Sequence, residues 1–263
     1  SYVKHHIQKI AAFFLAMRAF AKALETAGHN VLHLELDDSA TFVDLPELIT
    51  RLCEQYGITH FEYQRPDEYR LWLQLQELDL EAFSISKTRV DTEHFIVPFD
   101  ELKRYFTSGK GTRMEGFYRK MRKAHNIMMD GDEPLGGQWN FDAENRSKLK
   151  KTDLPAIPKP LIFENQIDDL LSKLDKHQVS HFGEIGDTLV WPITRKQSLE
   201  LLDYFCQYCL PNFGRFQDAM TANSEHAWSL YHSRLSFAIN AKILSPLTVV
   251  NRAIAEFESR PDD

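Results

Sequence analysis

The sequence lacks the features of membrane proteins and of disulfide-rich secreted proteins. Its 263 residues contain only three cysteines, Cys53, Cys206 and Cys209. Three thiols cannot build a disulfide framework, and an odd number favours reduced thiols in a reducing compartment. No apolar run approaches the roughly 20 residues that cross a bilayer, and the N-terminus lacks the pattern of a signal peptide. We therefore expect a soluble, cytoplasmic protein without a membrane partner.

Several common catalytic motifs are also absent. The chain contains no G-x-G-x-x-G, P-loop, H-E-x-x-H or G-x-S-x-G, so the usual dinucleotide, phosphoryl-transfer, metalloprotease and esterase signatures are missing. Cys206 and Cys209 have the C-x-x-C spacing of redox and metal sites, but Cys53 is the sole other thiol, and four-thiolate coordination is impossible. We interpret Cys206 and Cys209 as buried structural thiols in a helix and predict no metal site.

The net charge of -7 argues against a protein that binds nucleic acid over most of its surface. Between Lys110 and Lys123, however, six basic residues face a single acidic one, Glu115, which gives this segment a net charge of +5. Such a run is most often a solvated helix face, and contact with phosphates is the alternative. The basic residues are Lys110, Arg113, Arg119, Lys120, Arg122 and Lys123.

The first half of the chain has the alternating pattern of an α/β protein. Apolar residues at helical spacing predict a first helix from Ile7 to about Leu24, with Gly28 after its end. Further strands and helices predict βαβ units in a Rossmann-like, doubly wound parallel sheet. The predicted strands are 31–36, 60–63 and 83–86, with a further apolar piece at 94–97, and the predicted helices are 45–56, 68–78, 100–106 and 113–127.

A βαβ crossover needs a strand before its helix, and residues 1–4 are too short for a buried one. We therefore expect the chain to begin inside a domain, with one or two strands missing before Ser1. A helix-first fold of another kind is the alternative.

The second half reads as helical after a proline-rich segment. Pro155, Pro158 and Pro160 disfavour helix and indicate a linker. Thr194 and Gln197 form a capping box that predicts a helix to about Cys209, and further helices are expected at 228–243 and 247–257. The expected domains are an α/β domain at 1–149, a linker at 150–164 and the start of an all-α domain at 165–263.

Two polar pairs in the α/β half allow a ligand role. His5 and His6 open the first helix, where cations oppose the helix macrodipole; they either bind a ligand or are ordinary surface residues. Asp37 and Asp38 follow a predicted strand, where open α/β sheets bind ligands, although capping of a loop is the more common role of such residues.

The segment 231–246 has the composition of a phosphate-binding segment. His232, Ser233 and Ser236 supply imidazole and hydroxyl donors within about one turn, and Arg234 adds a planar cation. Leu235 and its apolar neighbours are expected to face the core.

This segment resembles the T-S-x-L-S-x-x-L pattern by which photolyases hold the pyrophosphate of FAD, with His232 in place of Thr and Phe237 where Pro is common. Further blocks are similar to the iron-sulfur bacterial cryptochromes and photolyases, also called deoxyribodipyrimidine photolyase-related proteins. In family order, the main blocks are residues 2–9, 16–20, 36–38, 113–122, 136–146, 191–195 and 213–220.

The resemblance implies an N-terminal antenna domain that binds 6,7-dimethyl-8-ribityllumazine and a C-terminal helical domain that binds FAD. It implies His232, Ser233, Arg234, Leu235 and Ser236 as contacts of the FAD phosphates. It also implies Tyr2 and His5 as residues of the lumazine pocket. The activity it implies is light-driven repair of ultraviolet pyrimidine photoproducts in damaged DNA, with six-four lesions favoured.

The part of the family that encloses the flavin ring has no counterpart in this sequence, nor have the histidine pair for lesion chemistry and the four cysteines of the iron-sulfur cluster. We therefore expect a fragment with no catalytic residues of its own, inactive in repair alone and prone to self-association. The alternatives are a blue-light photoreceptor of the cryptochrome type and a stand-alone module that binds an antenna pigment.

Overall fold

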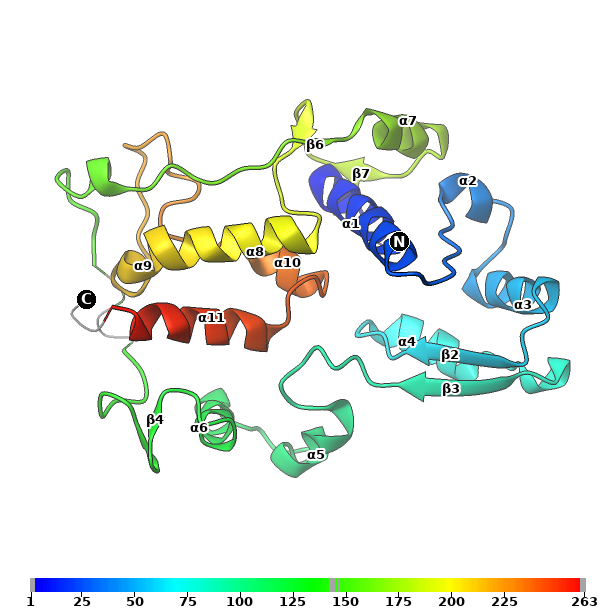
Figure 1. Cartoon of the computed structure of the whole chain (residues 1–263), viewed down its shortest axis with the longest axis horizontal. Coiled ribbons are helices and arrows are strands. Elements are labelled where there is room, and N and C mark those ends of the chain that lie inside the picture. Colours follow the sequence, from blue (N-terminus) through cyan, green and yellow to red (C-terminus); the bar gives the residue numbers. More distant parts are fainter. Residues whose placement is uncertain (1–2, 142–144, 146, 261–263) are drawn as a thin grey trace. The chain divides into compact units, whose positions relative to one another are not determined.

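The chain, seen in a computed structural model that describes residues 3–141, 145 and 147–260, separates into two compact units. The first contains the described residues up to Phe99 together with Ile167–Asp187. The second contains the described residues of Asp100–Gln166 and of Thr188–Asp263. Figure 1 traces the elements of both. The domain limits expected from the sequence remain a prediction.

The first unit is built around α1 (Ile7–Thr26), which confirms the predicted first helix. Its buried positions, among them Ile7, Ala11 and Leu15, follow helical spacing. The helix ends before Gly28, whose φ of +93° suits glycine. The other helices of this unit are α2 (Leu36–Ser39), α3 (Leu45–Gln55), α4 (Tyr69–Glu77) and α7 (Asp168–Lys176), and a 3-10 turn covers Glu81–Phe83.

The strands of the first unit form two parallel pairs. β2 (His60–Gln64) pairs with β3 (Ser86–Val90), and α4 lies between them in the sequence, so this segment is a βαβ unit (Figure 1). Lys87 on β3 donates hydrogen bonds to the carbonyls of Leu75 and Gln76, at the end of α4. β1 (His5–His6) pairs in parallel with β7 (His181–Phe182). The mixed α/β class is confirmed, and the pairs are separate sheets within the described residues.

Two predicted strands differ from the structure. Residues 29–35 carry no strand, because no described strand forms a hydrogen-bonded ladder with them, and α2 begins at Leu36. The strand expected at 83–86 begins only at Ser86. The 3-10 turn at Glu81–Phe83 and the left-handed backbone of Ser84, with φ of 60°, occupy its expected start. The piece 94–97 forms no strand either.

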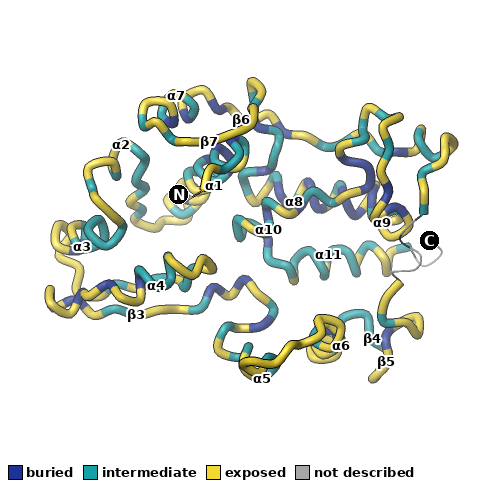
Figure 2. Tube along the Cα trace, turned by 180° about the vertical axis from the view of Figure 1, so that it is seen from behind, coloured by how far each residue is buried: buried dark blue, intermediate teal, exposed yellow. Residues whose placement is uncertain are grey.

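The second unit is mostly helical, with a core under α8 (Arg195–Tyr204). α8 continues through a π-helix at Phe205–Cys209 into α9 (Leu210–Phe216), and α11 (Pro246–Glu258) packs beside them. Figure 2 shows buried positions along this stretch. The core includes Leu201, Leu202, Phe205, Cys206, Cys209, Phe216, Tyr231, Leu235, Ala238 and Leu244.

The remaining elements of the second unit are short. A 3-10 turn (Phe99–Glu101) leads into α5 (Leu102–Tyr105), which is followed by α6 (Met114–Ala124) and by a hairpin of β4 (Met129–Asp130) and β5 (Glu133–Pro134). A 3-10 turn covers Leu154–Ala156, and β6 (Asn165–Gln166) pairs antiparallel with β8 (Thr188–Leu189). α10 is limited to Ser236–Asn240. Among the described residues, none of the helices is both long enough and apolar enough to traverse a bilayer.

The predicted helix at 228–243 is wrong over most of its length. Residues 221–235 form turns and irregular backbone, and Leu230 and Arg234 have φ values of 43° and 54°. Left-handed residues cannot continue a right-handed helix, so α10 begins only after the second of them. The helices expected at 45–56, 68–78, 113–127 and 247–257 are confirmed to within a few residues as α3, α4, α6 and α11.

Candidate functional site

The expected phosphate-binding segment lies on the core of the second unit. Tyr231 and Leu235 are buried in that core, while His232 and Ser236, the residue after each of them, are exposed. Tyr231 and Leu235, four residues apart, therefore hold the segment on the core, while Ser233 and Arg234 between them are half-buried. Leu235 is 2% exposed as a whole residue, so its side chain serves the core and not a ligand.

Arg234 is the most distinctive residue of this segment. Its guanidinium lies 5.3 Å from the centre of the Trp228 ring, and burial lowers the pKa of Arg234 below its ordinary value. No described carboxylate forms an ion pair with it, and burial raises the pKa values of its neighbours Tyr204 and Cys209, which keeps both of them uncharged near neutral pH. A partly buried cation without an anionic partner is costly, so this position favours an anion from outside the chain.

The neighbours of Arg234 leave hydroxyl and imidazole groups available. The Ser233 hydroxyl accepts a hydrogen bond from the backbone N–H of Leu235 at 3.5 Å, which leaves its own O–H free to donate. His232 and Ser236 make no side-chain hydrogen bond within the described chain. These donors, together with Arg234, could hold phosphate oxygens.

The C-x-x-C pair lies directly beneath this segment, in the π-helix Phe205–Cys209. Cys206 and Cys209 are both free and buried, as predicted for structural thiols. Burial raises the pKa of Cys209 to about 11 and raises that of Cys206 as well, so both stay protonated near neutral pH. Among the described residues, no set of three or more His, Cys, Asp or Glu side chains is placed to hold a metal ion.

The two histidines at the start of α1 have different roles. The Nδ1 atom of His6 accepts a hydrogen bond from the backbone N–H of Gln8 at 3.2 Å, so a neutral imidazole caps the helix. The ring also stacks edge-on against Phe182 at 5.4 Å. His5 is half-buried, and its imidazole makes no hydrogen bond within the described chain, which leaves this ring available to a ligand. Tyr2 lies outside the described residues.

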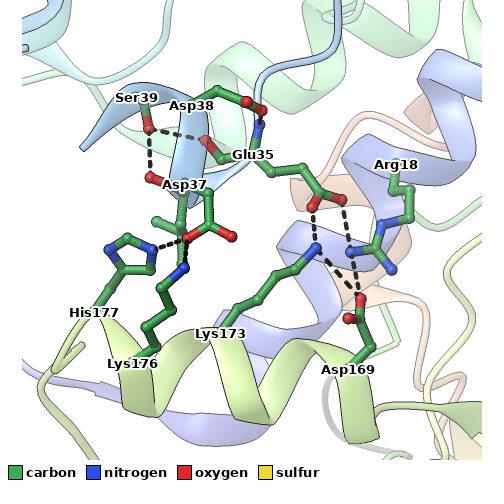
Figure 3. Close-up of polar contacts among 10 residues, drawn as sticks. Arg18, Glu35, Asp37, Asp38, Ser39, Asp169, Lys173, Lys176 and His177 are labelled. Atoms are coloured by element: carbon green, nitrogen blue, oxygen red, sulfur yellow. Dashed lines mark hydrogen bonds and ion pairs between the residues drawn. The ribbon is translucent and has the colours of Figure 1, made fainter. Parts of the chain in front are cut away.

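Asp37 and Asp38 belong to a network of ion pairs between α1, α2 and α7 (Figure 3). Asp38 accepts a hydrogen bond from the backbone N–H of Glu35 at 2.8 Å, so its predicted capping role is confirmed. Asp37 accepts from Lys176 and His177, both at 2.6 Å, and these contacts lower its pKa to about 2.

The same network fixes Glu35. Lys173 and Arg18 both contact its carboxylate, and Arg18 also reaches Asp169. A small pocket with an apolar wall, which includes Phe14 and Leu170, opens beside these charges. Arg18, Glu35 and Lys173, which line the pocket, are all paired within the chain, so the network serves mainly to attach α7.

Arg65, Trp72 and Phe99 form a cluster at the carboxyl end of β2. The Arg65 guanidinium stacks 3.6 Å from the centre of the Phe99 ring and 5.1 Å from that of Trp72. The Nε of Arg65 and the Nε1 of Trp72 are buried without a hydrogen-bond partner in the described chain. Buried donors of this kind usually have an acceptor, and the carboxyl ends of parallel strands are where open α/β sheets bind ligands.

The basic run is divided between structural and exposed residues. Arg119, Arg122 and Lys123 surround the Trp139 ring at 5.0 to 5.8 Å, and Arg122 is buried, with its guanidinium on the carbonyls of Ile127 and Met128. The remaining cations, Lys110, Arg113 and Lys120, are exposed and have no ion pair among the described residues.

Sequence reasoning missed Trp228, Trp139 and Arg65, because each acts through a contact with a residue some distance away in the chain. It also missed the capping role of His6, because an imidazole was treated as a cation and not as a neutral acceptor. The signal for this capping role is a His just before the first turn of a helix, because the backbone N–H groups of that turn lack partners within the helix and a ring nitrogen can accept from one of them.

Comparisons with known proteins agree over most of the chain. The model of the family described as "Deoxyribodipyrimidine photo-lyase-related protein" matches residues 1–190. A protein of Agrobacterium fabrum named "(6-4) photolyase" is 31% identical over 254 residues, which is 96% of this chain and 49% of that protein. "Uncharacterized protein R852" of Acanthamoeba polyphaga mimivirus is 23% identical over 152 residues, 56% of this chain and 74% of that protein. The chain thus spans about half the length of the photolyase that it matches.

Proposed function

Because this chain belongs to the deoxyribodipyrimidine photo-lyase-related protein family, we propose that it takes part in light-driven repair of pyrimidine photoproducts in DNA. Six-four lesions are the proposed substrate, since the Agrobacterium relative carries that name. The first unit would belong to a Rossmann-like antenna domain, and the second would open the flavin-binding domain. The βαβ unit β2–α4–β3 supports the former assignment.

The observation that carries the proposal is the unpaired, partly buried Arg234 beside three side-chain donors. The diphosphate of FAD fits this chemistry, with Arg234 neutralising charge and His232, Ser233 and Ser236 donating hydrogen bonds. The Leu235 N–H is partly engaged by Ser233, so its contribution would be small. When bound, reduced FAD supplies the electron for photochemistry; the chain's own residues bind and orient it.

The first unit offers two places for the antenna chromophore. His5 has a free imidazole, and the orphan donors of Arg65 and Trp72 lie at a strand end with stacked aromatic rings. A planar lumazine with carbonyl acceptors matches donors of this kind. We propose that 6,7-dimethyl-8-ribityllumazine binds in the first unit, with His5 as one contact.

An absorbance spectrum of the purified chain, reconstituted with lumazine and FAD, tests the assignment of the two units. We expect a lumazine band and little retained FAD, since the chain covers half the relative's length. A lumazine band alone also fits a stand-alone pigment-binding module, so an activity assay must follow.

That assay measures blue-light loss of a six-four photoproduct from an oligonucleotide. It is run on this chain and on any longer natural polypeptide that contains it. The chain alone should be inactive and the longer protein active. Absence of light-dependent repair by the longer protein would contradict the enzyme assignment and leave a photoreceptor as the better description.

A further inference from the structure

We propose that the outward face of α6 is a binding ridge for the phosphate backbone of duplex DNA, independent of light, flavin and lesion. The ridge consists of Arg113, Gly116, Lys120 and Lys123. This inference rests on the proposed function for its choice of DNA as the partner. The inference goes beyond the proposed function because it assigns the DNA contact to a particular surface and to named residues.

The spacing of these residues places them on one side of the helix. Arg113 is the N-cap of α6, and Gly116, Lys120 and Lys123 follow at intervals of three or four residues. All are exposed. Nothing lies within 4 Å of the place where a side chain on Gly116 would begin, so a bulky partner can approach the backbone there.

The sides of α6 beside and behind the ridge are partly occupied. Phe117 contacts the rings of Phe106 at 4.9 Å and Tyr105 at 5.6 Å, and Met121 is buried. Arg122 is also buried and holds backbone carbonyls. An amphipathic helix that binds a membrane surface needs a continuous apolar face. On α6, Met114 and Tyr118 are exposed, but Phe117 and Met121 pack within the second unit and interrupt that face.

The acidic residues near the ridge do not neutralise it. Glu115 is engaged by Arg119 at 2.6 Å, and Asp132, whose side chain is 94% exposed, lies 3.5 Å from Lys123. Arg113 and Lys120 have no ion pair among the described residues. The ridge therefore carries at least two uncompensated positive charges in a chain whose net charge is -7.

Trp139 keeps the neighbouring cations in place. Its ring lies among Arg119, Arg122 and Lys123, so the ridge residue Lys123 and the neighbouring arginines are held in place before any ligand arrives. Arg113 and Lys120 are seven residues apart, which is about 10 Å along a helix, or about three phosphate steps of one DNA strand. This geometry fits a linear row of phosphates better than a single small anion.

The test measures binding of the whole chain, in the dark and without flavin, to a fluorescein-labelled, undamaged DNA duplex by anisotropy over a series of salt concentrations. The ridge variant is R113Q/K120Q. The matched control is K9Q/K22Q, which removes the same charge from exposed positions on α1. Circular dichroism confirms that both variants are folded.

We expect the ridge variant to bind roughly 10- to 100-fold more weakly at about 0.1 M salt, with the slope of log affinity against log salt smaller by about two. The control should stay within about twofold of the unsubstituted chain. Equal slopes for the ridge variant and the unsubstituted chain would overturn the proposal, and so would an equal loss in the control.

Vesicles of phosphatidylserine and phosphatidylcholine separate DNA from a membrane surface as the partner. Sedimentation should show no binding that depends on the ridge; vesicle binding lost in R113Q/K120Q while DNA binding is retained would overturn the proposal. Because the assay uses undamaged DNA in the dark, its result is independent of photorepair. The ridge proposal can fail while the repair assay succeeds, and the repair assay can fail while the ridge proposal holds.

Discussion

The imidazole of His6 lies directly against the Cα of Gly183, so that a Cβ added to Gly183 would be 2.1 Å from the Nε2 atom of His6. Gly183 also has a φ of +78°, a conformation that other residues rarely adopt. His6 is the last residue of β1, and Gly183 directly follows β7. Their contact therefore joins the start of α1 to the segment after α7. Glycine is required here for two independent reasons.

Gly183→Ala should therefore lower the free energy of unfolding by about 2 to 4 kcal/mol, the sum of a clash and of left-handed strain. Urea unfolding measures it. Gly57→Ala is the matched control, because Gly57 has a φ of +60° but open space around it, and about 1 kcal/mol is expected. In H6A/G183A the cost of G183A should shrink; strict additivity would contradict the proposed contact.

Asp37→Asn should remove a pH-dependent contribution to stability. The contacts with Lys176 and His177 lower the pKa of Asp37 from 3.8 to about 2. A lowered pKa stabilises the fold above the unfolded value, and this contribution is lost as the pH falls from about 4 to about 2.

The unfolding free energy of the unsubstituted chain should therefore exceed that of D37N at pH 5, and the difference should vanish toward pH 2. Asp132→Asn is the control, since the Asp132 side chain is almost fully exposed and its pairing is loose. A difference between the unsubstituted chain and D37N that persists at pH 2 would refute the assignment.

Arg234→Met should change the stability of the ligand-free chain little, because the loss of the contact with Trp228 is offset by removal of a partly buried charge that has no carboxylate partner among the described residues. Arg215→Met is the comparison: Arg215 stacks on Phe216 at 4.6 Å and lies 4.0 Å from Asp153, so its loss should cost about 0.5 to 1 kcal/mol. Millimolar pyrophosphate should raise the melting temperature of the unsubstituted chain but not of R234M. An equal rise in both would place the anion elsewhere.

Trp139→Leu should destabilise the second unit by about 1 to 2 kcal/mol, because three cations lose their aromatic partner. Glu115→Gln removes only the exposed ion pair with Arg119 and should cost less than about 0.5 kcal/mol. Thermal unfolding compares the two variants. Equal effects would show that the cations are held by carboxylates and not by the indole ring.

The helices that could be predicted from the sequence include those whose first turns are marked by a capping side chain. Thr194 caps α8 by accepting from the backbone N–H of Gln197, and Asp44 caps α3 in the same way, so local composition sufficed. The extended segment at 29–35 was misjudged because a strand needs a neighbour that no local pattern reveals. Leu230 and Arg234 broke a predicted helix because left-handed backbone at non-glycine residues leaves no mark in a hydrophobic pattern.

The same distinction applies to the candidate sites. The donors at 232–236 are adjacent in the chain and could be identified from their composition. That Arg234 has no anionic partner in the part of the chain that the structure describes is a property of its tertiary surroundings, and composition could not predict it. In the basic run, composition gave the charge, but only the fold separates Arg122, which is buried, from Lys120, which is exposed.

The return of Ile167–Asp187 to the first unit bears on how this chain is made. A ribosome delivers residues in order, at roughly 5 to 20 per second, so nascent α1 and α2 emerge well before α7. The ion pairs of Arg18 with Asp169 and of Glu35 with Lys173 must therefore wait for α7. During that interval the first unit has an uncovered side, at a stage when aggregation and chaperone capture compete with folding. Expression at lower temperature, which slows both synthesis and aggregation, should therefore increase the yield of folded protein.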